Sequence, residues 1–305
     1  MNSKQITLDF TRLDPAEKIK AIADKALARM GELQHEEQAE VPEAQVIPFP
    51  TVWPDISRAA PSCVLRSALF GVVQRGRRRY LERQELAAWK DVTIRYTGMR
   101  LDQADLDVWM QAVHLFRHCG LGERLNVSAY ALLKAIGRHT GKGDHEWLTS
   151  SLARLIACAV EIRVNKKLYA GNLVREFWLD QETGHYVLSI NPQLASLFAD
   201  GYSQMEWEQR QALGARDLAK WLLGYISTHQ ATGANPHRIG LDKLQQLCGS
   251  EMDAKEFKRQ TRRYLDELKG LEVIDSWRFT GADSHTVEFI KPSVKPELQT
   301  AEVTG

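Results

Sequence analysis

The stretch with the clearest chemistry runs from Asp253 to Lys269, DAKEFKRQTRRYLDELK. Successive residues of a helix lie ~100° apart around its axis, so this stretch would present two separate faces. The predicted apolar face consists of Phe257, Thr261, Tyr264, Leu265 and Leu268, and the cationic face of Lys255, Lys258, Arg259, Arg262 and Arg263. The apolar face can dock on a domain while the cations enter a major groove, where Arg grips guanine edges and Lys neutralises phosphate. The pattern predicts a DNA-reading helix; the alternative is the solvated face of a structural helix.

A second candidate helix, His145 to Cys158, carries fewer outward charges. Its candidate DNA contacts are Lys142, His145, Thr149, Ser150 and Arg154. The alternative for this helix is a structural role. In that case much of the surface around it would contact protein.

Two short cationic clusters are candidates for phosphate contact, which positions a protein on DNA without reading its sequence. One lies in a predicted loop and the other near a predicted hairpin, and they contain Arg75, Arg77, Arg78 and Arg79, and Lys166 and Lys167. A role in solubility is the alternative for both clusters.

The segment from Gln5 to Phe10, QITLDF, fits the QxxLxF pattern that the bacterial sliding clamp recognises. A segment outside a folded core can present Gln5, Leu8 and Phe10 to a hydrophobic groove and become ordered only on binding. Three fixed positions also recur by chance, which is the alternative reading.

Signatures of catalysis and of cofactor binding are missing from the sequence. Residues 137–142, GRHTGK, are one residue too short for a phosphate-binding loop. His114 and His118 stand four apart without the glutamate and the third ligand of a zinc site. The four cysteines form no CxxC pair and stand far apart, at Cys63, Cys119, Cys158 and Cys248. We therefore predict a protein that is not an enzyme and has no metal or cofactor.

The predicted elements that would position these candidates fall into two similar sets. The first set is helices 103–118, 127–138 and 145–158 with strands 92–96, 159–164, 174–179 and 186–190. The second set is helices 215–229, 241–247 and 253–269 with strands 273–279 and 286–290. Helices followed by β-hairpins are typical of a winged helix.

We therefore expect an α+β fold with tandem winged-helix domains over residues 58–192 and 193–290. An N-terminal amphipathic helix and an acidic, Pro-rich tether would occupy residues 1–57, and a flexible tail residues 291–305.

Charge is unevenly distributed although the formal net charge is only +1. Residues 1–57 hold six Lys/Arg against ten Asp/Glu, whereas residues 58–100 hold ten against three. An acidic segment before a basic body is compatible with nucleic-acid binding. The chain lacks a secretion signal and any run of ~20 apolar residues, so we expect a cytoplasmic protein without membrane contact.

Several dispersed motifs resemble the TrfA-type plasmid replication initiators and occur in the same order. They are Trp53-Pro54-Asp55, Arg66-Ser67-Ala68-Leu69-Phe70, Ile94-Arg95-Tyr96-Thr97-Gly98, Ser151-Leu152-Ala153-Arg154-Leu155, Leu197-Phe198-Ala199 and Cys248-Gly249-Ser250. The resemblance covers most of residues 53–290.

This resemblance implies a protein that binds direct repeats, called iterons, in double-stranded DNA at a plasmid origin. It also implies opening of adjacent A+T-rich DNA, contacts with the host replicative helicase, chromosomal initiator and sliding clamp, and a homodimer as an inactive form. The family's clamp segment would correspond to residues 45–49, where Gln45 and Phe49 match but Pro48 replaces the expected leucine. Residues 5–10 are therefore the better clamp candidate.

Two other functions compete with this interpretation. A transcriptional regulator with the same fold would bind a promoter without supporting replication. An enzyme such as an origin-nicking relaxase would leave a cleaved or tyrosine-linked strand.

Overall fold

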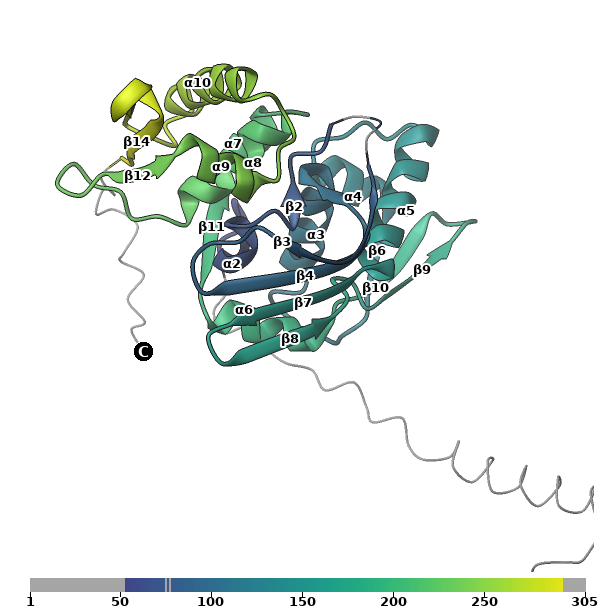
Figure 1. Ribbon diagram of the computed structural model, residues 1–305. Coiled ribbons are helices and arrows are strands. Elements are labelled where there is room, and N and C mark those ends of the chain that lie inside the picture. Colours follow the sequence, from purple (N-terminus) through teal and green to yellow (C-terminus); the bar gives the residue numbers. More distant parts are fainter. Residues whose placement is uncertain (1–52, 75, 77, 293–305) are drawn as a thin grey trace, which may run out of the picture. The chain divides into compact units, whose positions relative to one another are not determined.

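The computed structural model describes residues 53–74, 76 and 78–292, a unit in which helices pack beside small β-sheets (Figure 1). The predictions for the N-terminal helix and tether, the clamp segments, Arg75, Arg77 and the end of the tail lie outside these residues. Within the described part of the chain, no helix is long and apolar enough to cross a membrane.

The first half of the unit contains the three predicted helices among ten strands. Its helices are α2 (Ser62–Leu65), α3 (Gln103–Leu115), α4 (Ala129–Ala135) and α5 (Lys142–Ala157). Its strands are β1 (Ser57–Pro61), β2 (Phe70–Gly71), β3 (Tyr80–Leu86), β4 (Val92–Met99), β5 (Leu101–Asp102), β6 (Leu125–Ser128), β7 (Ala159–Val164), β8 (Lys167–Gly171), β9 (Glu176–Asp180) and β10 (His185–Ser189). The helix α3 begins where the Asp102 side chain accepts hydrogen bonds from the backbone N–H groups of Ala104 and Asp105.

Two antiparallel sheets organise this half. One has the strand order β3-β4-β7-β8, and the other the order β6-β10-β9. In the first sheet Ile94 pairs with Ile162 and Tyr96 with Val160, and all four side chains are buried. The next residues along β4 and β7, such as Arg95 and Arg163, are exposed, as expected for a sheet with one face in the core.

The second half contains fewer strands than the first. Its helices are α6 (Ala195–Ala199), α7 (Trp207–Ala212), α8 (Asp217–Ser227), α9 (Leu241–Cys248) and α10 (Ala254–Gly270), with short 3-10 turns at Pro192–Leu194 and Ala282–Ser284. Its strands are β11 (Tyr202–Glu206), β12 (His237–Gly240), β13 (Ser276–Thr280) and β14 (Thr286–Ile290). The last three strands form an antiparallel sheet in the order β12-β14-β13.

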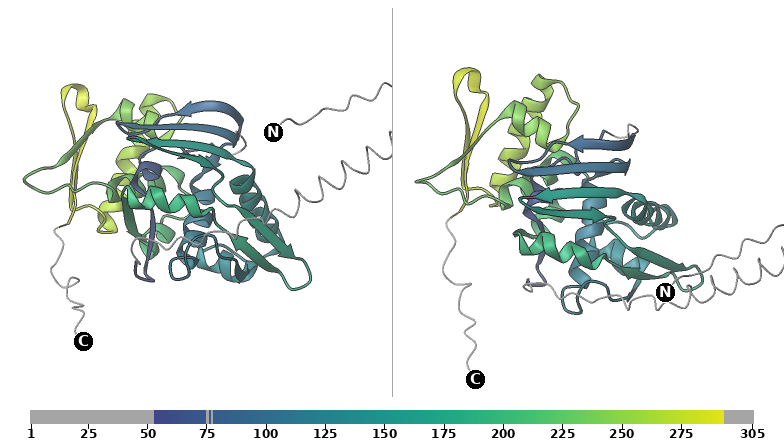
Figure 2. Two further views of the ribbon diagram at one scale, coloured as in Figure 1. Left: turned by 90° about the horizontal axis from the view of Figure 1, so that it is seen from below. Right: turned by 60° about the horizontal axis from the view of Figure 1, so that its bottom comes forward.

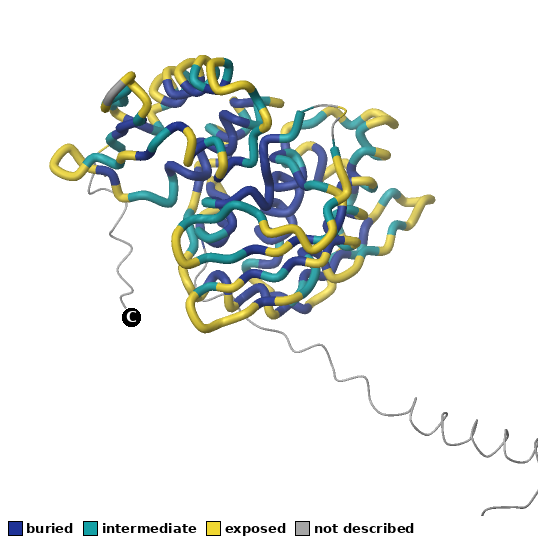
Figure 3. Tube along the Cα trace, in the orientation of Figure 1, coloured by how far each residue is buried: buried dark blue, intermediate teal, exposed yellow. Residues whose placement is uncertain are grey.

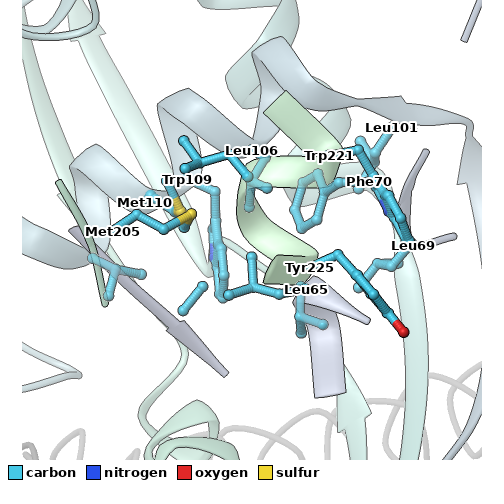
Figure 4. Packing of buried hydrophobic residues seen from close by; sticks show 14 of the residues in the cluster. Leu65, Leu69, Phe70, Leu101, Leu106, Trp109, Met110, Met205, Trp221 and Tyr225 are labelled. Atoms are coloured by element: carbon cyan, nitrogen blue, oxygen red, sulfur yellow. The ribbon is translucent and has the colours of Figure 1, made fainter. Parts of the chain in front are cut away.

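One hydrophobic core runs through both halves. In Figure 4, Trp109 and Met110 of α3 lie beside Leu65 of α2, and the same cluster includes Met205 of β11 and Trp221 of α8. The strand β1 also pairs with β11, from Ser57 opposite Glu206 to Pro61 opposite Tyr202. The predicted division at residues 192 and 193 stays a prediction, and the structure adds that strand pairing and apolar packing cross it.

A buried ion pair network links the same two halves. Asp107 of α3 accepts from Arg210 Nε of α7 at 2.6 Å and from Lys220 Nζ of α8 at 2.5 Å. Arg210 also donates to the Gln103 side chain at 3.0 Å, and its own side chain is only 1% exposed. Removing one partner of such a network would leave a buried charge without compensation, so these residues fix how α3 meets α7 and α8.

Candidate nucleic-acid interface

The predicted DNA-reading helix is α10, and its start is set by Asp253. The carboxylate of Asp253 accepts from the backbone N–H of Lys255 at 2.9 Å, which caps the helix. The buried residues of the helix are the five predicted ones, Phe257, Thr261, Tyr264, Leu265 and Leu268. Figure 3 shows the opposite face of α10 as a largely exposed stripe. The amphipathic prediction for this helix is confirmed.

The five cations of α10 lie on this accessible side. Lys255, Arg259, Arg262 and Arg263 are exposed, and Lys258 is half-buried. Within the described residues, the one ion pair among them joins Arg259 to Glu256 at 2.6 Å, and the Arg259 side chain remains 64% exposed. The charges are therefore available to an external anion.

Two of these cations also contact the neighbouring hairpin. Lys258 Nζ and the Arg262 guanidinium each lie 5.4 Å from the centre of the Phe279 ring. Lys258 in addition donates to the backbone oxygen of Asp283 at 2.9 Å. The tip between β13 and β14 is thereby held beside the cationic face of α10.

The turn between α9 and α10 is anchored on the first half. Gly249 ends α9 with φ +63°, a conformation that favours glycine. Val72 N–H donates to the Cys248 carbonyl at 2.8 Å, and Arg100 donates to the Gly249 carbonyl and to Glu251. These bonds fix the start of α10 relative to the strands around residue 100.

The candidate residues on α5 divide into two groups. Lys142 and Ser150 are exposed, whereas Thr149 is half-buried and its hydroxyl bonds that of Tyr186 at 2.6 Å. Arg154 instead pairs with the fully buried Asp105 at 2.6 Å, and only 16% of its side chain is exposed. Arg154 therefore stabilises the interior of the first half, and its side chain is much less exposed than that of Arg259 on α10.

The loop and hairpin cations show a similar split. Arg78 pairs with Asp102 and Asp105, the latter at 2.7 Å, so it holds the start of α3. Lys167 pairs with Asp200 at 2.7 Å but stays 64% exposed, and Lys166 is exposed. The Asp105 carboxylate thus pairs with both Arg78 and Arg154, and the spacing of these residues in the sequence did not indicate that they share a partner.

The structure also shows two exposed arginines that the sequence analysis did not single out. Arg238 of β12 and Arg278 of β13 flank Glu288 of β14 in register. Each binds the nearly buried Glu288 carboxylate, at 2.5 and 2.6 Å, while 60% and 70% of the two side chains remain exposed. The alternation of residues in the predicted strand 273–279 could have placed Arg278 on this outward face.

The two histidines considered for a metal site have other surroundings. His114 Nδ1 accepts from Trp53 Nε1 at 3.0 Å, and burial lowers the pKa of His114 to about 4. His118 is exposed. Across the described residues, no group of three or more His, Cys, Asp or Glu side chains is arranged to hold a metal ion.

Comparison with known proteins gives matches over most of the chain. The family model described as TrfA protein matches residues 14–284. A relative, the plasmid replication initiator protein TrfA of Escherichia coli, is 26% identical over 295 residues, which cover 90% of this chain and 74% of the relative. Among solved structures, RctB domains 2-3 align with 13% identity and a TM-score of 0.49, over 73% of this chain and 95% of that chain. The Pi initiator protein in complex with iteron DNA aligns with 14% identity and a TM-score of 0.46, over 62% and 92%.

Proposed function

The chain belongs to the TrfA family of plasmid replication initiators, and from this premise we propose that it binds direct repeats at a plasmid origin through two winged-helix domains. The order α3, β6, α4, α5 and the hairpin β9–β10 would form the first domain, within residues 58–192. The order α8, β12, α9, α10 and the hairpin β13–β14 would form the second, within residues 193–290. Each is the order of a helix-turn-helix followed by a wing.

The observation that carries this proposal is the surface of α10. Its apolar residues are buried and its five cations lie on the accessible side, next to the hairpin that would be the wing. Lys255, Lys258 and Arg263 would neutralise phosphates, and Arg259 and Arg262 would reach base edges in the major groove. The ion pair with Glu256 would hold Arg259 ready without burying it.

The first domain would add smaller contacts at α5 and at the β7–β8 turn. Lys142 and Ser150 of α5 are exposed and stay in the proposal, as does Thr149, whose hydroxyl bonds Tyr186. Lys166 in the turn and Lys167 beside Asp200 are exposed as well and would contact phosphate separately from α5. Arg78 and Arg154 are left out because both are committed to Asp105. Arg77 lies outside the described residues, so its proposed phosphate contact rests on sequence alone.

The proposed sequence of events after binding follows the family. Several copies on adjacent repeats would bend the duplex. The strain of this bending would open the neighbouring A+T-rich DNA, because its base pairs are the weakest. The host helicase and chromosomal initiator would then be recruited, a homodimer would be the inactive form, and no catalytic step is assigned to the chain.

The clamp contact is a separate part of the proposal, and it lies in the N-terminal segment. Replacing Leu8 and Phe10 by alanine should abolish binding to purified sliding clamp, while the same change at Gln45 and Phe49 should leave it intact. Equal binding by wild type and the first variant would remove residues 5–10 as the site.

The main test removes two cations from α10. In the Arg259→Ala, Arg262→Ala double variant, we expect affinity for the repeats to fall about 100-fold or more, since each good base contact is worth roughly 1–3 kcal/mol. Arg83→Ala, Arg95→Ala is the matched control, because these two arginines are exposed on β3 and β4 and no proposed DNA contact lies on either strand. Unchanged affinity and footprint in the α10 variant would contradict the proposal.

Footprinting on the neighbouring plasmid DNA separates an initiator from a promoter-binding regulator. Evenly spaced protection over direct repeats, together with replication of a plasmid carrying those repeats, is expected. Protection of a single promoter site without replication would support the regulator instead.

A further inference from the structure

The hairpin β9–β10 presents an exposed aromatic ring among acidic side chains. Trp178 is 75% exposed at the centre of β9, and Glu176 and Asp180 share its face of the strand because they are two residues away on either side. Residues 176–189 contain three acidic side chains, with Glu182 near the tip, and no lysine or arginine. Arg124 of the same chain donates to Glu176 at 3.0 Å, but this pair lies at the surface and the Glu176 side chain stays 48% exposed, so it can accept a second cation. This hairpin is the proposed wing of the first domain, but DNA phosphate would repel the face of β9 that carries Glu176, Trp178 and Asp180, so that face would point away from DNA and its tryptophan suits a protein.

The outward face of the sheet β12-β14-β13 has the opposite character. Arg238 and Arg278 converge on Glu288, whose side chain is 5% exposed, so the buried carboxylate fixes both guanidinium groups. A guanidinium has five N–H donors, and each of these uses only part of them on Glu288. The remaining donors can bind a carboxylate, and the guanidinium group itself can lie over an aromatic ring.

These two surfaces lie at opposite ends of the described unit in all three views (Figures 1 and 2). Each lies beside one proposed reading helix. Tyr186 of β10 bonds Thr149 of α5, and Phe279 of β13 lies under Lys258 and Arg262 of α10. Copies bound to direct repeats all have the same orientation, so the hairpin end of one copy would face the sheet end of the next.

We propose that the hairpin β9–β10 of one copy docks on the Arg238–Arg278 face of a second copy bound to the adjacent repeat. The guanidinium groups would lie over Trp178 and pair with Glu176 and Asp180. The inference rests on the proposed binding of direct repeats, and it adds the surface through which neighbouring copies cooperate.

The partner committed to is a second copy in head-to-tail order. A symmetric pair of β9 strands would set Glu176 opposite Asp180 of the other copy, and these like charges repel. The head-to-tail contact is heterologous and open-ended, which matches a row of repeats of any length. It is also small, so it would be weak in free solution and effective only when DNA holds the copies close together.

The first test compares duplexes carrying one and two of the repeats identified by footprinting. For the wild type we expect a copy on the second repeat to bind about tenfold more tightly once the first is filled, the size of one cation–aromatic contact with exposed ion pairs. Trp178→Ala should remove this cooperativity and leave the affinity for a single repeat unchanged. Tyr80→Ala is the matched control, because Tyr80 is 63% exposed on β3, in the sheet β3-β4-β7-β8, which contains neither surface.

The second test uses the sheet face and a mixture of variants. Changing Arg238, Glu288 and Arg278 together to glutamine removes the cations without leaving a buried carboxylate unpaired. This triple variant alone should bind without cooperativity, as Trp178→Ala does. A mixture of the triple variant and Trp178→Ala should recover part of the cooperativity. In one of the two orders on the DNA, the intact hairpin of the triple variant faces the intact sheet of Trp178→Ala. A folding defect could not give that recovery.

Three outcomes would overturn the inference. Trp178→Ala could keep the wild-type cooperativity, or the mixture could show no recovery. The triple variant could instead bind a single repeat more weakly with a smaller salt dependence, which would make the arginines phosphate contacts. If the wild type bound no repeat at all, the proposed function itself would fail, and this inference with it.

Discussion

Thr261 lies on the packed face of α10, where its side chain is fully buried. Its Oγ1 has no hydrogen-bond partner among the described residues. A buried hydroxyl without a partner loses its bonds to water and gains nothing in return. Thr261→Val keeps the shape and removes the hydroxyl, so we expect it to raise the free energy of unfolding by about 1 kcal/mol in urea denaturation.

Ser151 provides the control of opposite sign for this prediction. Its buried hydroxyl donates to Asp105 Oδ1 at 2.7 Å. Ser151→Ala should therefore lower the free energy of unfolding, by about 1–3 kcal/mol, because the Asp105 carboxylate loses a donor. A destabilised Thr261→Val protein would contradict the prediction, because it would mean that the Thr261 hydroxyl is hydrogen-bonded in the folded protein, for example to a bound water.

At the scale of elements, the turn between α9 and α10 decides where the cationic helix begins. A Cβ atom at Gly249 would lie 2.6 Å from Arg100 Nη2 and 3.1 Å from Ala68 Cβ, and the residue has φ +63°. Gly249→Ala should therefore displace Arg100 from its bonds to the turn as well as strain the backbone. We expect the free energy of unfolding to fall by about 2–4 kcal/mol.

Gly214 allows the backbone strain to be measured alone. It has φ +57°, but a Cβ atom there would meet nothing within 4 Å. Gly214→Ala should cost only about 1 kcal/mol, the price of a left-handed backbone for an L residue. Equal losses for the two variants in urea denaturation would mean that Arg100 adapts without cost.

How far the elements could be predicted depends on whether their signals are local. The helix α10 was readable because its buried set follows the helical period and Asp253 marks its start. The strands β1 and β11 were not predicted, because Ser57–Pro61 and Tyr202–Glu206 become strands only by pairing across 140 or more residues of sequence. Local periodicity carries no information on such a partner.

The candidate site shows the same limit. The spacing of Lys255 to Arg263 predicted a shared face, and the structure places them on one. The spacing of residues in the sequence could not show that Arg78 and Arg154 meet at Asp105, because these three residues come from a loop, α5 and α3 respectively. Tertiary packing decides whether a buried carboxylate pairs with two arginines. The sequence shows that an arginine is charged but not whether that charge is already paired within the fold.

At the scale of the whole molecule, acidic groups of both halves meet at a cavity of about 740 Å³. Asp217, the first residue of α8, lines it together with Asp102 and Asp107 from the start of α3. Burial raises the pKa of the Asp217 carboxyl to about 7, and the negative charge of Asp102 adds to the effect. Packing the two halves together therefore places a carboxylic acid where its charged form is disfavoured.

This arrangement predicts how stability depends on pH. The unfolded chain would lose the Asp217 proton near pH 3.8 and the folded chain only near pH 7, so ionisation opposes folding. The contribution of Asp217 is complete below about pH 4 and is lost as the pH rises through about 7. Asp217→Asn removes this loss. We expect the variant to match the wild type at pH 4 and to exceed its free energy of unfolding by about 1–3 kcal/mol at pH 8. Urea denaturation of both proteins across this range gives a difference curve that isolates Asp217, and a flat curve would mean that the carboxyl is solvated in the folded protein.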